Sequence, residues 1–253
     1  MPNPTLALAD ADIANMERAT LDAVAPPATG AIENWLLPFD TSTIGRAKSA
    51  VPLRHHQLDA AQVAEIEALY AARSLKAAFR VADAPALANI HTALQRLGYR
   101  AEQPTLVQIG TVRQMRSLCQ ATPAAVSTTP TPAWAAVYLG DGFDPVDGAH
   151  RVQALSRSRH VVYASVQEAD QPLAAGTASF SQGWASIHGM RTAAHSRGRG
   201  LAARVLAGLA DAAALQGLER VFLQVEEDNH AALALYGRAG FATAWRYHYW
   251  RKP

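Results

Sequence analysis

The chain has 253 residues, of which 49% are hydrophobic and 17% charged, a composition that excludes an intrinsically disordered protein. A formal net charge of +2 argues against a nucleic-acid partner, and the single cysteine excludes an internal disulfide and a zinc site built from cysteines. Residues 1–20 carry acids where a signal peptide carries bases, and no stretch approaches the roughly 18 apolar residues of a membrane span. We therefore expect a cytoplasmic protein with no membrane partner.

The first half of the chain predicts a small α/β unit. Segments 33–40 (ENWLLPFD) and 45–53 (GRAKSAVPL) are typical of a hairpin, and segment 59–74 is typical of a helix. Residues 75–99 then predict a strand, a short acidic turn and a second helix, ending in a Gly-aromatic pair.

An uncharged stretch rich in proline, threonine and alanine, QATPAAVSTTPTPA, follows at residues 120–133. Such a composition is typical of a linker. We expect an N-terminal domain over residues 1–119, a linker over 120–132 and a C-terminal domain over 133–253. No metal site is expected, because the pair His55-His56 has no third ligand at a useful spacing.

The second half predicts a mixed α/β layer around one sheet. The alternation of apolar residues and the positions of glycine predict strand, strand, strand, helix, strand, helix, strand at residues 160–166, 172–180, 184–193, 200–217, 220–226, 229–240 and 241–253. Gly200 begins the long helix and Gly217 ends it, while Asn229 is the expected N-cap and Gly240 the expected C′ residue of the shorter one.

The two halves share a pattern. Residues 75–99 can be laid over residues 218–241 with one extra residue, and both read strand, acidic turn, helix and Gly-aromatic. We interpret this as two tandem copies of one α/β unit. The alternative is that any two strand–helix pairs look alike.

The stretch HSRGRGLA (195–202) joins a predicted strand to the long helix. A helix N-terminus has unpaired N–H groups and a partial positive charge, and glycines allow a close approach to an anion. Four arginines and no acid occur in residues 190–204, namely Arg191, Arg197, Arg199 and Arg204. The stretch therefore predicts a pyrophosphate site, although G-x-G alone fits a basic surface turn equally well.

Asn229 and Tyr236 are seven residues apart, which places them on one face of the shorter helix. From there an amide and a phenol can both address a ligand. The alternative is that Tyr236 is a core residue with its hydroxyl at the surface.

These motifs in this order resemble the GNAT superfamily of N-acetyltransferases. The resemblance covers about residues 185–248: a strand, a match to [Q/R]-x-x-G-x-[G/A], a long helix, a strand, and then N-x-x-A-x-x-L-Y-x-x-x-G-F. His195 stands where the family usually has Gln or Arg. The resemblance implies an α/β (α+β) fold of two tandem GNAT-like units, each a mixed central sheet flanked by helices.

The resemblance also implies acetyl-coenzyme A as donor, an amine as acceptor and a role for particular residues. The backbone at Met190, Arg191 and Thr192 would bind the pantetheine arm, Asn229 would hold the cofactor near its thioester, and Tyr236 would bind there and act as general acid. The phosphate loop would comprise Arg197, Gly198, Arg199, Gly200, Leu201 and Ala202.

The general base is open among Glu226, Glu227 and Asp228, of which we favour Glu226; the alternative is a solvated acidic turn. Tyr247 and His248 either line an acceptor pocket or belong to the core. The acids of the loop 139–150 either attract a cationic amine or form a solvated turn.

The first of the two copies lacks the counterparts of Tyr236, Asn229 and the glycine-rich stretch. Leu94 occupies the position that matches Tyr236, Leu87 or a neighbour matches Asn229, and VPLRHHQLD ahead of the first helix has no glycine. We expect a non-catalytic unit that shapes the acceptor site.

The sequence thus predicts an acetyl-CoA-dependent N-acetyltransferase acting by direct attack. The alternatives are a CoA-binding regulatory module or pseudoenzyme, and a nucleic-acid binder that uses the arginines. The acceptor is unidentified, and the chain is expected to be a monomer or a homodimer.

Overall fold

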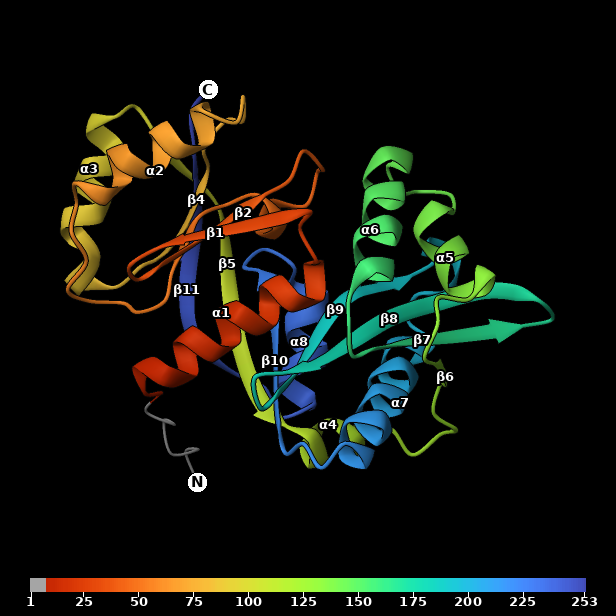
Figure 1. The fold of residues 1–253 in the computed structure, drawn as a ribbon. Helices are drawn as coiled ribbons and strands as arrows, with labels where there is room; N and C mark the ends of the chain where they lie inside the picture. The colour runs from red at the N-terminus through yellow and green to blue at the C-terminus, as the bar shows by residue number, and fades with distance from the viewer. Residues whose placement is uncertain (1–7) are drawn as a thin grey trace.

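The computed structural model of the chain describes residues 8–253. It contains an eight-stranded sheet, a three-stranded sheet beside it, and helices on both faces of the larger one (Figure 1). The large sheet has the spatial order β4 (Phe79–Ala82), β11 (Ala242–Arg251), β5 (Arg100–Thr111), β10 (Arg220–Glu226), β9 (Trp184–Thr192), β8 (Gln171–Ser181), β7 (Val161–Glu168) and β6 (Ala125–Ser127). The small sheet consists of β1 (Ala28–Ile32), β2 (Trp35–Phe39) and β3 (Val51–Pro52). The expected mixed sheet flanked by helices is confirmed for the large sheet, while the small sheet is entirely antiparallel.

Strands of both halves interleave in the large sheet. β5, from the first half, lies between β10 and β11 and pairs antiparallel with both. Residues 120–132, expected to be a plain linker, contain β6, which pairs antiparallel with β7. A composition rich in proline and threonine did not reveal this short edge strand.

The expected hairpin of residues 33–40 and 45–53 is only partly correct. The main partner of β2 is β1, which it meets over five residue pairs, while β3 contributes two. Residues 45–47 form instead the 3₁₀ helix η1 (Gly45–Ala47). β1, with the sequence ATGAI and mostly exposed, has too few large apolar residues to be recognised from its pattern.

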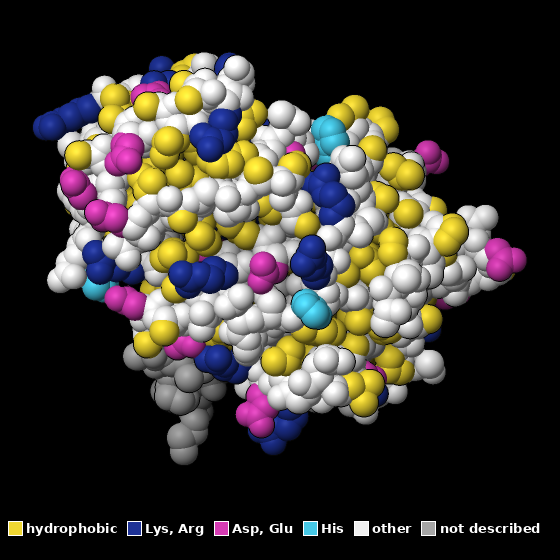
Figure 2. Space-filling model, viewed as in Figure 1, with side chains coloured by type: hydrophobic (Ala, Val, Ile, Leu, Met, Phe, Trp, Pro, Cys, Tyr) yellow, Lys and Arg dark blue, Asp and Glu magenta, His cyan; other side chains and the backbone are white. Residues whose placement is uncertain are grey.

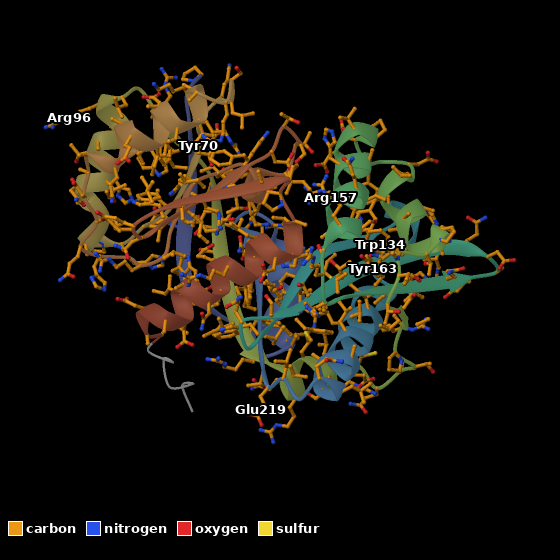
Figure 3. All side chains as sticks on the ribbon, viewed as in Figure 1. Tyr70, Arg96, Trp134, Arg157, Tyr163 and Glu219 are labelled. Atoms are coloured by element: carbon orange, nitrogen blue, oxygen red, sulfur yellow. The ribbon has the colours of Figure 1, made fainter. Side chains whose placement is uncertain are left out.

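The helices form two layers on the large sheet. One layer holds α4 (Val112–Ser117), α7 (Leu201–Leu215) and α8 (His230–Arg238); the other holds α1 (Asp10–Val24), α5 (Pro132–Leu139), α6 (Pro145–Arg157) and η1. Val221 and Leu223 pack with α7, whereas Phe222 packs with α1, as the alternation along a strand requires. In Figure 3, Trp134 of α5 lies beside Tyr163 of β7, with ring centroids 4.8 Å apart.

The remaining helices, α2 (Gln62–Ala71), the 3₁₀ helix η2 (Pro85–Leu87) and α3 (Ala88–Arg96), belong to the first half. They lie at one end of the molecule next to the small sheet and β4 (Figure 1). On the face drawn in Figure 2, lysine and arginine side chains are scattered among acidic ones and do not form a stripe. Among residues 8–253, no helix combines the length and the apolar character needed to cross a membrane.

The ends of the two helices that were predicted in the second half, α7 and α8, are confirmed. Gly200 is the N-cap of α7 with φ 74°, and Gly217 follows the helix with φ 69°, both in the left-handed region that favours glycine. Asn229 caps α8 by accepting a hydrogen bond from the N–H of Ala232 at 3.2 Å. Gly240, with φ 83°, terminates α8 as expected.

The acidic segment 139–150 is partly helical, which corrects the expectation of a loop. Asp144 is the N-cap of α6 and accepts a hydrogen bond from the N–H of Asp147 at 2.7 Å, with Pro145 in the first turn. Asp147 lies inside the helix, where it pairs with Arg151 and Arg191. These acids cap a helix and neutralise arginines and do not form a freely solvated patch.

Candidate active site

β9 and β10 lie parallel, pair at 185–187 against 221–223, and then separate. Beyond that point β9 stays paired with β8 and β10 with β5. The wedge between residues 188–192 and 224–226 therefore exposes an edge of β9 that no strand covers in the described chain. Such an edge can bind an extended ligand through its backbone. A cavity of about 310 Å³ opens at this wedge.

β9 carries a bulge at the wedge. Its register with β8 shifts between His188 and Arg191. Within the shift, Gly189 has φ 63°, and its carbonyl oxygen accepts a hydrogen bond from the Tyr138 hydroxyl at 2.6 Å. A bulge leaves a residue unpaired and redirects the strand, which is common beside active sites.

The wedge cavity brings together five of the predicted site residues: Met190, Arg191, Glu226, Asn229 and Tyr236. They come from β9, the end of β10 and α8, which are adjacent in space. The Met190 side chain packs over Gly176 of β8, where a Cβ would lie 2.5 Å from the methionine sulfur. Thr192 and the loop 197–202 do not line this cavity.

Tyr236 is a core residue and a cavity residue at once. Its side chain is 6% exposed and packs in the α7 core, with its ring centroid 5.9 Å from that of Phe241. Burial raises the pKa of the Tyr236 phenol to about 12. The phenol therefore keeps its proton at neutral pH, as a general acid must.

Of the three candidate bases, Glu226 lines the cavity. It is exposed at the end of β10, and one carboxylate oxygen accepts a hydrogen bond from the amide of Gln103 at 2.8 Å. Glu227 instead forms an ion pair with Arg246 at 3.3 Å. Glu226 is thus the one candidate base of the three that lies at the cavity.

The N-terminus of α7 offers a row of free amides. In the described chain, the N–H groups of residues 198–202 donate to no other group, whereas those of Ala203 and Arg204 both donate to the carbonyl of Gly200. Gly198 and Gly200 have positive φ, and a Cβ on either would meet nothing within 4 Å. Five open amides at a helix N-terminus fit an anion such as a pyrophosphate. Leu201 is 3% exposed, so it can offer only its backbone.

Three of the four arginines in residues 190–204 are bound to partners elsewhere in the fold. Arg191 pairs with Asp147 at 2.7 Å and Arg199 with Glu168 at 2.5 Å. The Arg204 Nε donates to the carbonyl oxygen of Thr122 at 2.8 Å. Their partners come from distant parts of the chain, which the local sequence does not reveal. His195 is exposed in the 3₁₀ helix η3 (Ala194–Ser196).

Sequence reasoning missed the cavity residues that the first half contributes: Thr43, Ile44, Gly45, Arg46, Gln103 and Thr105. It also missed His188, Gln224, Tyr249 and Arg251 of the second half. No local motif marks any of them, because their proximity depends on how η1 and β5 pack against β10 and β11.

Tyr247 is a core residue, almost completely buried, that also lines the cavity. Its hydroxyl donates to the side-chain oxygen of Gln224 at 2.9 Å. His248 does not line the cavity and instead binds Asp83 at 2.8 Å. Burial, and then the charge of Arg46, lowers the pKa of His188 well below its usual value, so this side chain is neutral.

A larger and more open groove of about 1030 Å³ lies between α1, β1 and the β8–β9 turn. It contains none of the predicted site residues. The wedge cavity, by contrast, holds five of them beside the strand separation and the bulge of β9.

Comparison with known proteins gives two matches in sequence. A family model described as "Probable histone acetyltransferase Rv0428c C-terminal" matches residues 10–250. The "Uncharacterized N-acetyltransferase YobR" of Bacillus subtilis (strain 168) is 31% identical over 117 residues, which cover 41% of this chain and 47% of that protein. The chain thus matches about half the length of this curated relative.

Solved structures share the fold. A GCN5-related N-acetyltransferase from Kribbella flavida has a TM-score of 0.71 at 17% identity and covers 95% of both chains. A conserved protein of unknown function from Staphylococcus epidermidis has a TM-score of 0.67 at 12% identity, covering 89% of this chain and 94% of the other. A tandem GNAT protein from the clavulanic acid biosynthesis pathway has a TM-score of 0.59 at 15% identity and covers 96% of both chains.

Proposed function

The chain belongs to the GNAT acetyltransferases, in the family described as probable histone acetyltransferase Rv0428c C-terminal, and from this premise we propose that it moves an acetyl group from acetyl-CoA to an amine by direct attack. The observation that carries the proposal is the wedge between β9 and β10, which joins an uncovered strand edge to the buried phenol of Tyr236. The open amides at the start of α7 follow β9 in the chain.

In this proposal the two units of the chain have different roles. Residues 133–253 form the catalytic unit, which contributes β9, β10, α7 and α8. Residues 1–119 form the degenerate unit, in which Leu94 is fully buried at the position that matches Tyr236. The first unit supplies β5 and the η1 segment, so it shapes the acceptor side of the cavity.

The cofactor would lie along the wedge. The backbone at Met190, Arg191 and Thr192 would bind the pantetheine arm as an added strand, and residues 197–202 would bind the pyrophosphate through their amides. Asn229 uses its Oδ1 to cap α8, which leaves its NH₂ group to hold the arm near the thioester.

The thioester supplies an activated acyl group. The amine nitrogen attacks its carbonyl carbon, a C–N bond forms and the C–S bond breaks. A backbone N–H near Met190 would stabilise the oxyanion, Glu226 would take the proton from the amine, and Tyr236 would give its proton to the departing thiolate.

The competing proposal is a CoA-binding module or pseudoenzyme. Its support is that Glu226 is exposed and accepts a hydrogen bond from Gln103. The candidate base is therefore less enclosed by the protein than the candidate acid, Tyr236. Both proposals require the same cofactor site and differ only in turnover.

Calorimetric titration with acetyl-CoA, followed by an assay of free thiol released with a panel of amines, separates the proposals. We expect binding and thiol release that depends on an amine. Binding without release on any amine favours the pseudoenzyme, and an absence of binding contradicts both.

A further inference from the structure

The lining of the wedge cavity carries an excess of positive charge. Its arginines are Arg46, Arg151, Arg191 and Arg251, and its one carboxylate is that of Glu226. Asp147 forms ion pairs with both Arg151 and Arg191, so its single negative charge balances one of the two, and Glu102 pairs with Arg251. One lining arginine forms no ion pair with any described residue.

That arginine is Arg46. Among residues 8–253 no carboxylate forms an ion pair with it, and its buried Nε has no hydrogen-bond partner. The nearby Glu17 carboxylate is occupied, because both of its oxygens accept hydrogen bonds from Arg80. Arg46 therefore carries an uncompensated charge at the cavity.

Two further buried polar atoms at the same cavity have no partner within the described chain: Nη1 of Arg191 and Nε2 of His188. Buried polar groups in folded proteins are nearly always hydrogen-bonded. Guanidinium nitrogens are donors without acceptor capacity, so a group that completes them must accept hydrogen bonds, and their charge favours an anion.

An anion bound by these unpartnered groups would be distinct from the phosphates of the cofactor. Tyr247 and Tyr249, which line the cavity beside Arg46, pack with α1 on one face of the sheet, whereas α7 and Tyr236 pack on the opposite face. Gly45 fixes η1 against that first face, because a Cβ on it would lie 2.8 Å from the Tyr249 ring. The charge at Arg46 thus faces the acceptor side.

We propose that the acceptor is an amine that also carries an anionic group, such as a carboxylate, and that Arg46 binds this group and determines specificity. The inference rests on the proposed function and specifies its substrate class. The amine would face Glu226 and the thioester while the anion lies at Arg46. A lysine flanked by basic residues, as in a histone tail, would be repelled by the same charge.

The test is thiol release from acetyl-CoA with the L-amino acids and β-alanine, each paired with its own carboxamide, and with a lysine-rich peptide. We expect at least one acid to exceed its carboxamide by about tenfold or more in kcat/KM, mainly through KM. Arg46→Gln should remove this preference, because it lowers the kcat/KM of the acid far more than that of its carboxamide, and Arg46→Lys should restore part of the preference. Arg96→Gln, which removes an exposed charge at the far edge of α3 (Figure 3), is the matched control and should have no effect.

The inference is overturned if the carboxamides or the lysine-rich peptide are acetylated as well as the acids are. It is also overturned if Arg46→Gln lowers kcat/KM equally for an acid and its carboxamide. If acetyl-CoA binds but no amine is acetylated, the proposed acetyl transfer is contradicted, and the anion site is then tested by measuring the binding of the acids themselves. In that case the same acids and carboxamides are titrated into the CoA-saturated protein. Binding of acids alone, lost in Arg46→Gln, supports the anion site, and equal or absent binding overturns it.

Discussion

Tyr138 donates a hydrogen bond to the carbonyl oxygen of Gly189 at 2.6 Å and so ties α5 to the bulge of β9. The contact leaves no room for a side chain, because a Cβ on Gly189 would lie 2.7 Å from the same hydroxyl oxygen, and φ at Gly189 is already 63°. The shape of the wedge therefore depends on a helix that lies outside the motifs of the site.

Gly189→Ala should lower kcat/KM by about tenfold or more, because the added methyl group displaces the bulge from the position where the oxyanion donor is needed. Steady-state kinetics with acetyl-CoA measure the loss, and circular dichroism checks the fold. Gly183→Ala is the control: it has a similar φ of 75° and meets only the end of the flexible Arg220 side chain. Equal kinetics for the two variants would show that the bulge has no catalytic role.

Tyr236→Phe should lower kcat by about tenfold or more, with little change in the affinity for acetyl-CoA, since it removes a proton donor and keeps the buried ring. Tyr70→Phe removes another buried hydroxyl, bonded to the carbonyl oxygen of Pro38, and should cost stability alone. An unchanged turnover in Tyr236→Phe would remove this residue from the acid role.

Glu17→Gln should lower the free energy of unfolding by about 3–5 kcal/mol, because it leaves the guanidinium of Arg80 buried without a counter-charge. This pair joins α1 to β4. Urea unfolding measures the effect, and the double replacement Glu17→Met with Arg80→Met should recover most of the loss. A single variant within about 1 kcal/mol of the wild type would mean that the buried pair is not needed.

Asp147 links α6 to the cavity wall through hydrogen bonds from Arg151 at 2.6 Å, Arg191 at 2.7 Å and Thr43 at 3.0 Å. Burial raises the pKa of Asp147, but the hydrogen bond and charge of Arg151, the Thr43 hydroxyl and the charge of Arg191 outweigh it, so the pKa lies below its usual range. The folded protein thus binds this proton less tightly than the unfolded chain.

The resulting stability is present above the unfolded pKa of about 3.9 and is lost as the pH falls through the lower, folded value. Asp147→Asn should therefore destabilise the protein at neutral pH, and the difference from the wild type should shrink on acidification. Urea unfolding at about pH 7, 5 and 3 measures it. A difference that does not change with pH would assign the effect to packing.

The features predicted from the sequence are those with local causes. The ends of α7 follow from glycines that must adopt positive φ, the start of α8 from the capping side chain of Asn229, and β10 from its alternation of apolar residues. The start of α6 was also readable, since Asp144 followed by Pro145 is a helix-start signal, but its acids suggested a loop.

The features that escaped prediction depend on contacts between distant segments. Nothing in β5 indicates that it lies between β10 and β11, because strand order is set by packing and not by periodicity. Arg46 lies in a 3₁₀ turn without a motif, and only the position of η1 against β11 brings it to the cavity. The ion pairs of Arg191 and Arg199 could not be predicted either, since their partners Asp147 and Glu168 come from other elements.

The measurement that tests the cofactor site most directly is a calorimetric titration of acetyl-CoA into the wild type, Gly200→Glu and Gly217→Glu. Both glycines have positive φ and open space beside them, one at each end of α7, so the two replacements carry the same strain and the same charge. The proposed site predicts that the wild type and Gly217→Glu bind alike and that Gly200→Glu, which places a carboxylate at the open amides, does not bind. Equal binding by the two variants would contradict the assignment of the α7 N-terminus to the pyrophosphate.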